Sequence, residues 1–180
     1  MAALRCLIAC LQAQTYAHWE ALLTHDGPVR HSPDIDLLLS DLSRDKRLRW
    51  LETPEREGHF GHRWRHWAVT EHARGDYVGF TNDDNYYSPV WLEWLISDLI
   101  AHKADFAYCD MIHSHLKWRL LKTRPAYRHL DLGGFVARTG LIKSTPWKDF
   151  SFRGDGAYIN ALVKKAKRVV KVSAALFVHN

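Results

Sequence analysis

Segments with the pattern of a strand alternate with segments with the pattern of a helix through the first two thirds of the chain. Short runs of apolar, aromatic and β-branched residues are typical of strands, and apolar residues three or four apart are typical of one helix face. We expect strands at residues 19–24, 47–51, 76–81 and 105–112, separated by helices. This alternation predicts strand–helix–strand units, and therefore an α/β fold with a mainly parallel sheet and helices on both faces.

The last third of the chain is expected to complete this architecture. We expect a strand at residues 133–137, a helix at 154–167 and a closing strand at 169–178. Residues 113–129 combine histidine and aromatic side chains with lysine and arginine, and this composition fits two structures. One is a solvated hairpin, and the other is a loop that contacts an acceptor or a phosphate group.

Composition limits the chain to a few classes of protein. Its 180 residues are enough for one domain with a core of its own, which we place at residues 1–180. No apolar run reaches the length of a membrane-spanning helix. The three cysteines lack the spacing of a disulfide framework, which favours a reduced, cytoplasmic setting. The net charge of +5 favours anionic partners such as nucleotides.

A cluster of oxygen-bearing side chains follows the strand expected at residues 76–81. Residues 82–85 are Asn-Asp-Asp-Asn, and we expect Ser88 and Pro89 to begin the next helix. In open α/β sheets, ligands bind at the carboxyl ends of strands, and clustered carboxylate and amide oxygens suit Mg²⁺ or Mn²⁺. The alternative is a turn without a ligand, because Asn and Asp are common turn residues.

Several ordered segments of the chain, taken together, resemble the GT-A-fold glycosyltransferases, and in particular family 2. The turn at His25-Asp26-Gly27-Pro28 is similar to that family's Asp-Asp-Gly-Ser turn, and residues 81–85 resemble its DXD metal motif. Gly154-Asp155 resembles the site of its catalytic carboxylate, and His179 a terminal histidine of some members. The remaining similar segments are residues 14–20, 58–65 and 73–77.

The resemblance implies inverting transfer of a sugar from a nucleotide-diphosphate sugar to the hydroxyl of a glycan, a lipid-linked sugar or a small molecule. Asp155 would be the general base of this reaction. Asp84 would bind Mn²⁺ or Mg²⁺, and His179 would complete the metal shell. Four further residues would bind the nucleotide sugar: Asp26, Arg65, Asn82 and Asp83.

Each of these residues also has an ordinary structural explanation. Asp155 would stabilise the macrodipole as an acid in the first turn of a helix. Asp26 would form a turn, Arg65 would be a solvated helix residue, and His179 would be a terminal surface residue.

The chain also departs from the family pattern. It begins on what resembles the family's first helix, so we expect a GT-A domain that is short at its N-terminus and lacks the first strand. Asn82 and His25 stand where the family has acids. The alternative is therefore a catalytically silent relative that binds a nucleotide sugar or a protein, and free strand edges would favour a homo-oligomer. A nucleic-acid-binding module is disfavoured, because most of the eight tryptophans fall on expected core faces.

Overall fold

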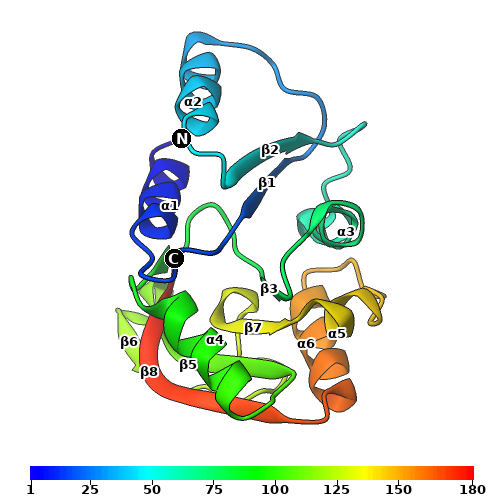
Figure 1. The fold of residues 1–180 in the computed structure, drawn as a ribbon. Helices are drawn as coiled ribbons and strands as arrows, with labels where there is room; N and C mark the ends of the chain where they lie inside the picture. The colour runs from blue at the N-terminus through cyan, green and yellow to red at the C-terminus, as the bar shows by residue number, and fades with distance from the viewer.

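The computed structural model describes residues 1–180 and contains two β-sheets with helices packed around them (Figure 1). The α-helices are α1 (Ala2–Gln12), α2 (Pro33–Ser43), α3 (His62–Trp67), α4 (Trp91–Ala101), α5 (Thr139–Lys143) and α6 (Gly154–Lys165). The strands are β1 (Ala21–His25), β2 (Leu48–Glu52), β3 (Tyr77–Gly79), β4 (Tyr86–Tyr87), β5 (Phe106–His113), β6 (Arg119–Leu121), β7 (Phe135–Arg138) and β8 (Val169–His179). Short helical turns are η1 (His59–Gly61), η2 (Ala68–His72), η3 (Ser114–Leu116) and η4 (Leu132–Gly134).

The smaller sheet consists of β1 and β2, which run parallel (upper part of Figure 1). Helices α1 and α2 pack against it through a small buried cluster that contains Ile8, Leu38, Leu42 and Leu48. Helix α2 begins at the residues that the sequence signals indicate. The Ser32 hydroxyl caps it by accepting a hydrogen bond from the Ile35 N–H group.

The larger sheet has the strand order β3–β7–β5–β8–β4, and β6 pairs with β5. Strands β5 and β8 are parallel, with register shifts on either side of Asp110, and at their ends His113 lies opposite His179. Strand β7 runs antiparallel to both of its neighbours, as do β6 to β5 and β4 to β8. The α/β class is confirmed, and the sheet is mixed because no crossover helix connects β5 to β6 or to β7.

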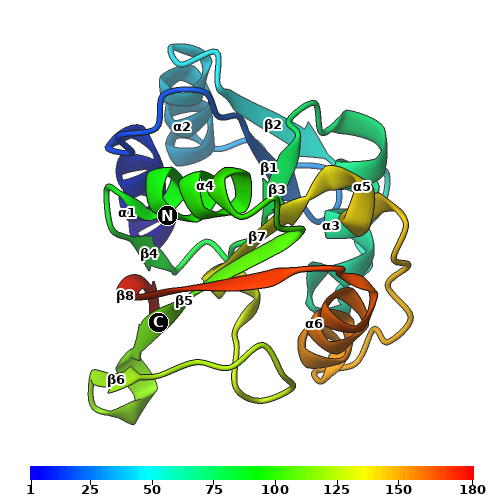
Figure 2. The ribbon, with the colours of Figure 1, turned by 60° about the horizontal axis from the view of Figure 1, so that its bottom comes forward.

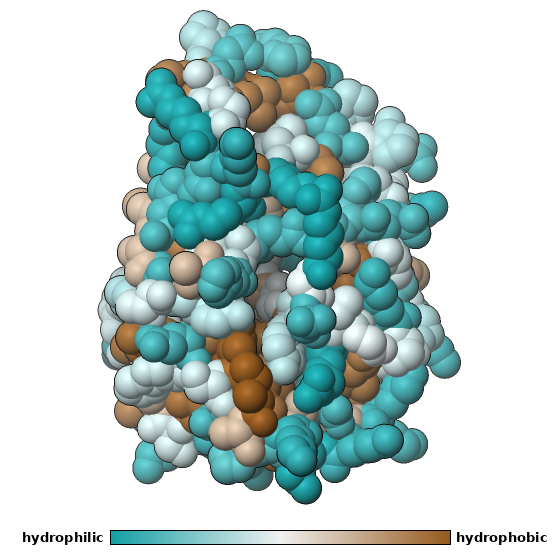
Figure 3. Space-filling model, viewed as in Figure 1, coloured by the Kyte–Doolittle hydropathy of each residue, from teal (hydrophilic) through white to brown (hydrophobic).

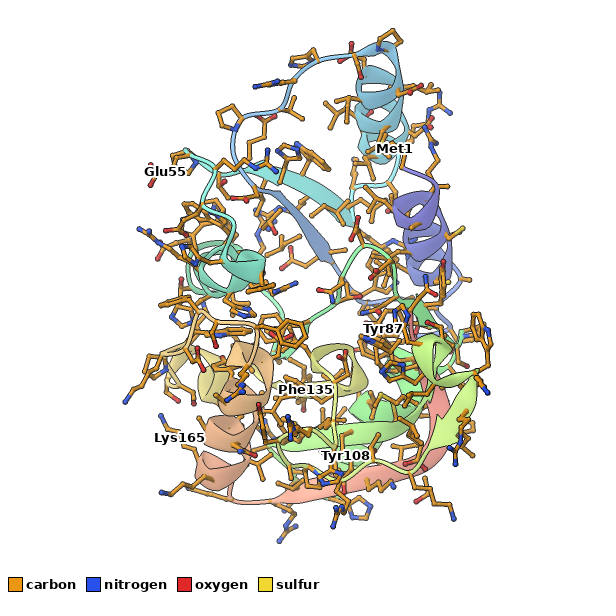
Figure 4. All side chains as sticks on the ribbon, turned by 180° about the vertical axis from the view of Figure 1, so that it is seen from behind. Met1, Glu55, Tyr87, Tyr108, Phe135 and Lys165 are labelled. Carbon is orange, nitrogen blue, oxygen red and sulfur yellow. The ribbon has the colours of Figure 1, made fainter.

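Helices cover both faces of the larger sheet, as expected (Figure 2). Alternate residues of β5 point to opposite faces: Ala107 and Cys109 face the helices α1 and α4, whereas Phe106 and Tyr108 face α5 and α6. Figure 4 shows the side chains packed between sheet and helices, with Tyr87 on one side of the core and Phe135 on the other. A strand buried on both faces is apolar throughout, which is why residues 106–109 have no polar alternation.

Several elements differ from the sequence-based expectation. The helix expected at residues 62–73 is α3 followed by η2, a single π-helical turn. Within residues 113–129, β6 folds back on β5 as a hairpin, which confirms that interpretation for the first half of the segment. The short elements β4 and α5 were not expected, because two and five residues are too few to show a period.

None of the helices combines the length and the apolar character that crossing a lipid bilayer requires.

Candidate active site

The acid-rich loop at residues 82–85 lies between β3 and β4, and β4 fixes its position. Tyr86 and Tyr87 pair with Val178 and Phe177 of β8, so the loop lies beside the last residues of the chain. The Asn85 side-chain oxygen accepts a hydrogen bond from the Asn180 N–H group at 3.4 Å. This pairing brings Asp84 close to His179, and these are the two residues predicted to bind a metal.

Asp155 lies in the first turn of α6, at the same end of the sheet. The preceding residue must be small: a Cβ atom on Gly154 would lie 2.2 Å from the carbonyl oxygen of Asp149 and 2.8 Å from Nε2 of His62. Glycine therefore allows α6 to begin against His62, with the Asp155 carboxylate directed at that ring.

His62 and Asp155 form a close pair that the sequence did not reveal. Oδ1 of Asp155 lies 3.2 Å from Nδ1 of His62, whose side chain is only 1% exposed. The other ring nitrogen, Nε2, lies 3.0 Å from the Ser151 carbonyl oxygen, which can only accept a hydrogen bond, so Nε2 carries a proton. The ring also stacks on Trp147, at 4.8 Å between centroids, which holds its orientation.

The protonation of this pair follows from its burial. Burial raises the pKa of Asp155 above its ordinary value, although the positive charges of Arg65 and His62 oppose the change. Burial likewise lowers the pKa of His62, and the neighbouring Asp155 opposes that change. In a neutral ring with its proton on Nε2, Nδ1 is an acceptor that faces a carboxylate, and the pair is therefore suited to take up one proton.

Arg65 connects the acid-rich loop to Asp155. Its guanidinium group donates a hydrogen bond to the side-chain oxygen of Asn82 and another, of 2.6 Å, to the carbonyl oxygen of Phe60. Burial lowers the pKa of Arg65, and the nearby carboxylates of Asp155, Asp131 and Asp83 act against this. An arginine remains protonated in proteins, so the site contains a fixed positive charge among several acids.

Asp131 is the second site residue that the sequence analysis missed. Oδ1 of Asp131 accepts a hydrogen bond of 2.9 Å from the N–H group of Gly133 and begins η4. Oδ2 lies 3.3 Å from Nδ1 of His179. Asp131 contributes most to raising the pKa of His179, and Asp84 and Asp155 add to it. An acid directly before Leu-Gly-Gly was the available signal, but it indicated only a helix cap.

The residues around Asp84 fit a divalent cation that arrives with a diphosphate. No three His, Cys, Asp or Glu side chains of the protein are arranged to hold a metal ion by themselves. Asp84 and His179 offer one carboxylate and one imidazole, and Asp131 faces Nδ1 of His179, an arrangement that leaves Nε2 free for a metal. Mg²⁺ and Mn²⁺ usually obtain their remaining ligands from phosphates and water.

Asp26, predicted to bind the nucleotide, already accepts three hydrogen bonds from the protein. Its carboxylate oxygens lie 2.8 Å from the N–H group of Glu57, 2.9 Å from that of Gly58 and 3.0 Å from the Trp64 indole nitrogen. Partial burial acts to raise the pKa of Asp26, but these donors outweigh it and lower the pKa below its ordinary value. Asp26 therefore joins the end of β1 to α3, and its contact with a nucleoside stays a prediction.

The structure thus brings most of the predicted site residues into one region. Around His179 and Arg65 lie the predicted residues Asn82, Asp83, Asp84 and Asp155. Asp26 is linked to this region through Trp64, which donates to it, and through the next residue, Arg65, which donates to Asn82. His62 and Asp131 complete the group.

Comparison with known proteins places the chain in a family. The model of a family described as glycosyl transferase family 2 matches residues 2–159. The chain belongs to glycosyl transferase family 2. The resemblance drawn from the sequence segments is therefore confirmed. No protein among the curated sequences matches this chain.

Solved structures of glycosyltransferases share its fold. The structure of S. aureus TarS 1–349 has a TM-score of 0.79 at 15% identity, over 99% of this chain and 56% of that chain. TarS 1–349 in complex with UDP-GlcNAc has a TM-score of 0.76 at 18% identity, over 98% of this chain and 54% of that chain. The mannosyltransferase PcManGT from Pyrobaculum calidifontis, in complex with GDP-Man and Mn²⁺, has a TM-score of 0.71 at 13% identity, over 99% of this chain and 53% of that chain. The family 2 chain therefore spans about half the length of these proteins.

Proposed function

We propose that this glycosyltransferase moves a sugar from a nucleotide-diphosphate sugar to an acceptor hydroxyl with inversion at the anomeric carbon, and that it depends on Mn²⁺ or Mg²⁺. The observation that carries the proposal is that Asp84 and Asp155 lie near the same residue, His179. The negative charges of both carboxylates raise the pKa of His179. Neighbours of similar fold were solved with UDP, UDP-GlcNAc or GDP-Man, which supports a nucleotide-diphosphate sugar as donor.

In this proposal Asp155 accepts the proton of the acceptor hydroxyl. The oxygen attacks the anomeric carbon on the face opposite the diphosphate, so one displacement inverts that carbon. A raised pKa makes the Asp155 carboxylate a stronger base, and Nδ1 of His62, 3.2 Å away, can share the proton that it takes up. Asp155 is the only acid in the first turn of α6, so its replacement removes the base from this helix.

The departing diphosphate gains negative charge, and the positive charge of Arg65 lies beside the acid-rich loop to stabilise it. Asp84 and the Nε2 atom of His179 would hold the cation, with Asp131 orienting the histidine. When bound, the cation supplies Lewis acidity at the diphosphate oxygens. Asn82 stands where the family has an acid, but its side-chain amide still provides an oxygen. This oxygen accepts a hydrogen bond from Arg65.

The proposal is tested by the release of nucleoside diphosphate from UDP-GlcNAc and from GDP-mannose in the presence of Mn²⁺, with water as the acceptor. We expect the change Asp155→Asn to lower this rate by about 10²–10⁴-fold, the usual contribution of a general base. The matched control is Asp34→Asn, because Asp34 is also an acid in the first turn of a helix, α2, and is exposed. Equal rates in the Asp155→Asn variant and the unchanged protein would remove Asp155 from the mechanism. A protein that binds the donors without releasing nucleotide would instead be the silent relative.

A further inference from the structure

The hairpin formed by β5 and β6 ends in an exposed turn. Figure 1 and Figure 2 both place β6 at the margin of the molecule. We call residues 114–120 the hairpin tip; they comprise η3, the turn after it and the first two residues of β6. Every residue from 115 to 120 is exposed. The hairpin tip is therefore available for binding.

The hairpin tip carries an apolar patch. Leu116, Trp118 and Leu120 are 47%, 62% and 57% exposed. Leu121, the next residue of β6, packs against the core, so Leu120 points to the opposite, outer face of the strand. By contrast, hydrophilic residues predominate on the face of the molecule that Figure 3 shows. Three large apolar side chains within five residues form a patch, and such a patch indicates a binding surface.

The turn holds Trp118 in an unusual backbone conformation. Lys117 and Trp118 have φ angles of 56° and 58°, in the left-handed region that favours glycine and asparagine. Bulky side chains in this region lower stability, and such strain is concentrated at functional sites. The ring of Trp118 gains little burial in exchange, because most of it is exposed. Packing within the chain therefore does not account for a tryptophan at this position.

Basic residues surround the patch, and no acid lies among them. Residues 111–130 contain no Asp or Glu and five basic residues, Lys117, Arg119, Lys122, Arg124 and Arg128. Their charge of +5 equals the net charge of the whole chain, so the charges of all other residues balance. All five side chains are exposed, and none of them forms an ion pair within the chain.

An apolar tip surrounded by positive charge fits the surface of an anionic lipid bilayer. Tryptophan is enriched at the level of the headgroups, because its ring is apolar and its N–H group is polar. Clusters of roughly four to eight Lys or Arg residues are attracted by anionic headgroups. A nucleic acid would engage the charges but leave Leu116 and Leu120 in water. A protein partner fits less well, because lysine is depleted at protein–protein interfaces.

We propose that the hairpin tip docks this protein on a membrane surface that contains anionic phospholipids. Leu116, Trp118 and Leu120 enter the headgroup region, and the basic residues of 111–130 bind the headgroups around them. The inference goes beyond sugar transfer, and its test requires neither a sugar donor nor a metal ion.

The docked bilayer would lie beside the proposed active site. His115 of the hairpin tip contacts His179, with 6.0 Å between ring centroids, and His113 at the end of β5 lies opposite His179. A lipid-linked acceptor would therefore reach the end of the sheet at which Asp155 lies. This consequence, unlike the docking itself, rests on the proposed function.

The test is sedimentation of the full chain with phosphatidylcholine vesicles that contain or lack phosphatidylglycerol, without donor or metal. We expect binding to the anionic vesicles to be about tenfold or more stronger than binding to the neutral vesicles, and to weaken as salt is added. Equal binding to both kinds of vesicle, or binding to neither, would overturn the inference.

Variants of Trp118 test the apolar part of the surface. Trp118→Asn is expected to weaken binding to the anionic vesicles by about tenfold or more, and asparagine tolerates the positive φ of the turn. Trp118→Phe should retain most of the binding. The matched control is Trp94→Gln, because Trp94 is 45% exposed on α4 and glutamine is well tolerated in helices. Unchanged binding by Trp118→Asn would mean that no apolar side chain inserts.

Two double variants test the charges, each with two positive charges removed. Lys117→Gln with Arg119→Gln is expected to weaken binding by about tenfold or more. Lys164→Gln with Lys167→Gln, at exposed positions at and after the end of α6, should have little effect. Equal losses in the two double variants would show that net charge alone governs binding, and would overturn the assignment to the hairpin tip. Melting temperatures confirm that each variant is folded.

Two other partners would give different results, and either would overturn the inference. Binding to double-stranded RNA that Trp118→Asn leaves intact, with no binding to vesicles, would assign the basic residues to a nucleic acid. A dimer that Trp118→Asn abolishes, again with no binding to vesicles, would assign the apolar patch to a second copy of the chain.

Discussion

At the scale of single residues, the pair of His62 and Asp155 decides what chemistry the site can perform. A half-buried carboxylate that faces a buried neutral imidazole is an unfavourable arrangement for folding, because Oδ1 of Asp155 and Nδ1 of His62 are both acceptors and neither supplies the other with a donor. The same arrangement favours catalysis, because the carboxylate binds a proton more readily than it does in water. The proposed role of Asp155 as the base would therefore account for such a costly pair at the start of α6.

We predict that His62→Phe shifts the acidic limb of the pH–activity profile to higher pH. Burial raises the pKa of Asp155, and at acidic pH the protonated form of His62 opposes this rise, so the loss of His62 raises the pKa of Asp155 further. The base must be deprotonated, and activity therefore falls at a higher pH than in the unchanged protein. Phenylalanine keeps the stack on Trp147. The measurement is kcat/KM for nucleotide release as a function of pH.

The exposed His102 provides the control for this experiment. The His102→Phe variant should keep the pH profile of the unchanged protein. If His62→Phe folds, as judged by its melting temperature, and has the same acidic limb as the unchanged protein, then His62 does not influence the base.

At the scale of elements, the close contact between the beginning of α6 and α3 positions the proposed base. Gly154 allows this contact, since any side chain there would meet the Asp149 carbonyl group and the His62 ring. The short strand β4 has the corresponding role for the residues proposed to bind the metal, because it pairs with the end of β8. Both elements place acids at one edge of the sheet.

We predict that Gly154→Ala lowers stability by roughly 1–3 kcal/mol, the usual cost of overpacking, and also lowers activity by displacing Asp155. Gly140→Ala is the matched control: Gly140 lies in α5 with no atom within 4 Å of an added Cβ, so alanine there should be neutral or slightly stabilising. Chemical denaturation of both variants measures the difference. Equal stability of the two variants would contradict the close contact at Gly154.

At the scale of the whole molecule, the proposed active site lies where the two sheets meet. Asp26 and His25 end the smaller sheet, while the acid-rich loop, Asp131 and His179 belong to the larger one. Helix α3 contacts both sheets: Trp64 donates a hydrogen bond to Asp26 after β1, and Arg65 donates one to Asn82 after β3. A ligand that contacts both the smaller and the larger sheet should therefore stabilise the whole fold.

We predict that UDP or GDP raises the melting temperature only when Mn²⁺ is present. At 100 times its dissociation constant, a ligand that binds only the folded state adds about 2.7 kcal/mol of stability. The change Asp84→Asn should remove most of this effect, whereas Asp76→Asn, at the exposed beginning of β3, should not. Thermal melts with Mn²⁺ and with a chelator make the measurement. Equal stabilisation by the nucleotide in the chelator would count against a cation at Asp84.

Local patterns in the sequence determined the α/β class, most of the longer helices and strands, and the acid-rich loop after β3. These features depend on residues close together in the chain: the period of apolar residues, the Ser32 cap and the Asn-Asp-Asp-Asn run each lie within one segment. The family resemblance added the order of the segments and the choice of Asp155, Asp84 and His179.

The tertiary structure alone decided the partners of those residues. His62 meets Asp155, and Asp131 meets His179, across parts of the chain whose spacing carries no local signal. The direction of β7 and the short pairing of β4 with β8 depend likewise on which strands become neighbours when the core closes. Contacts between distant segments form because the whole core is packed together, and no short stretch of sequence contains that information.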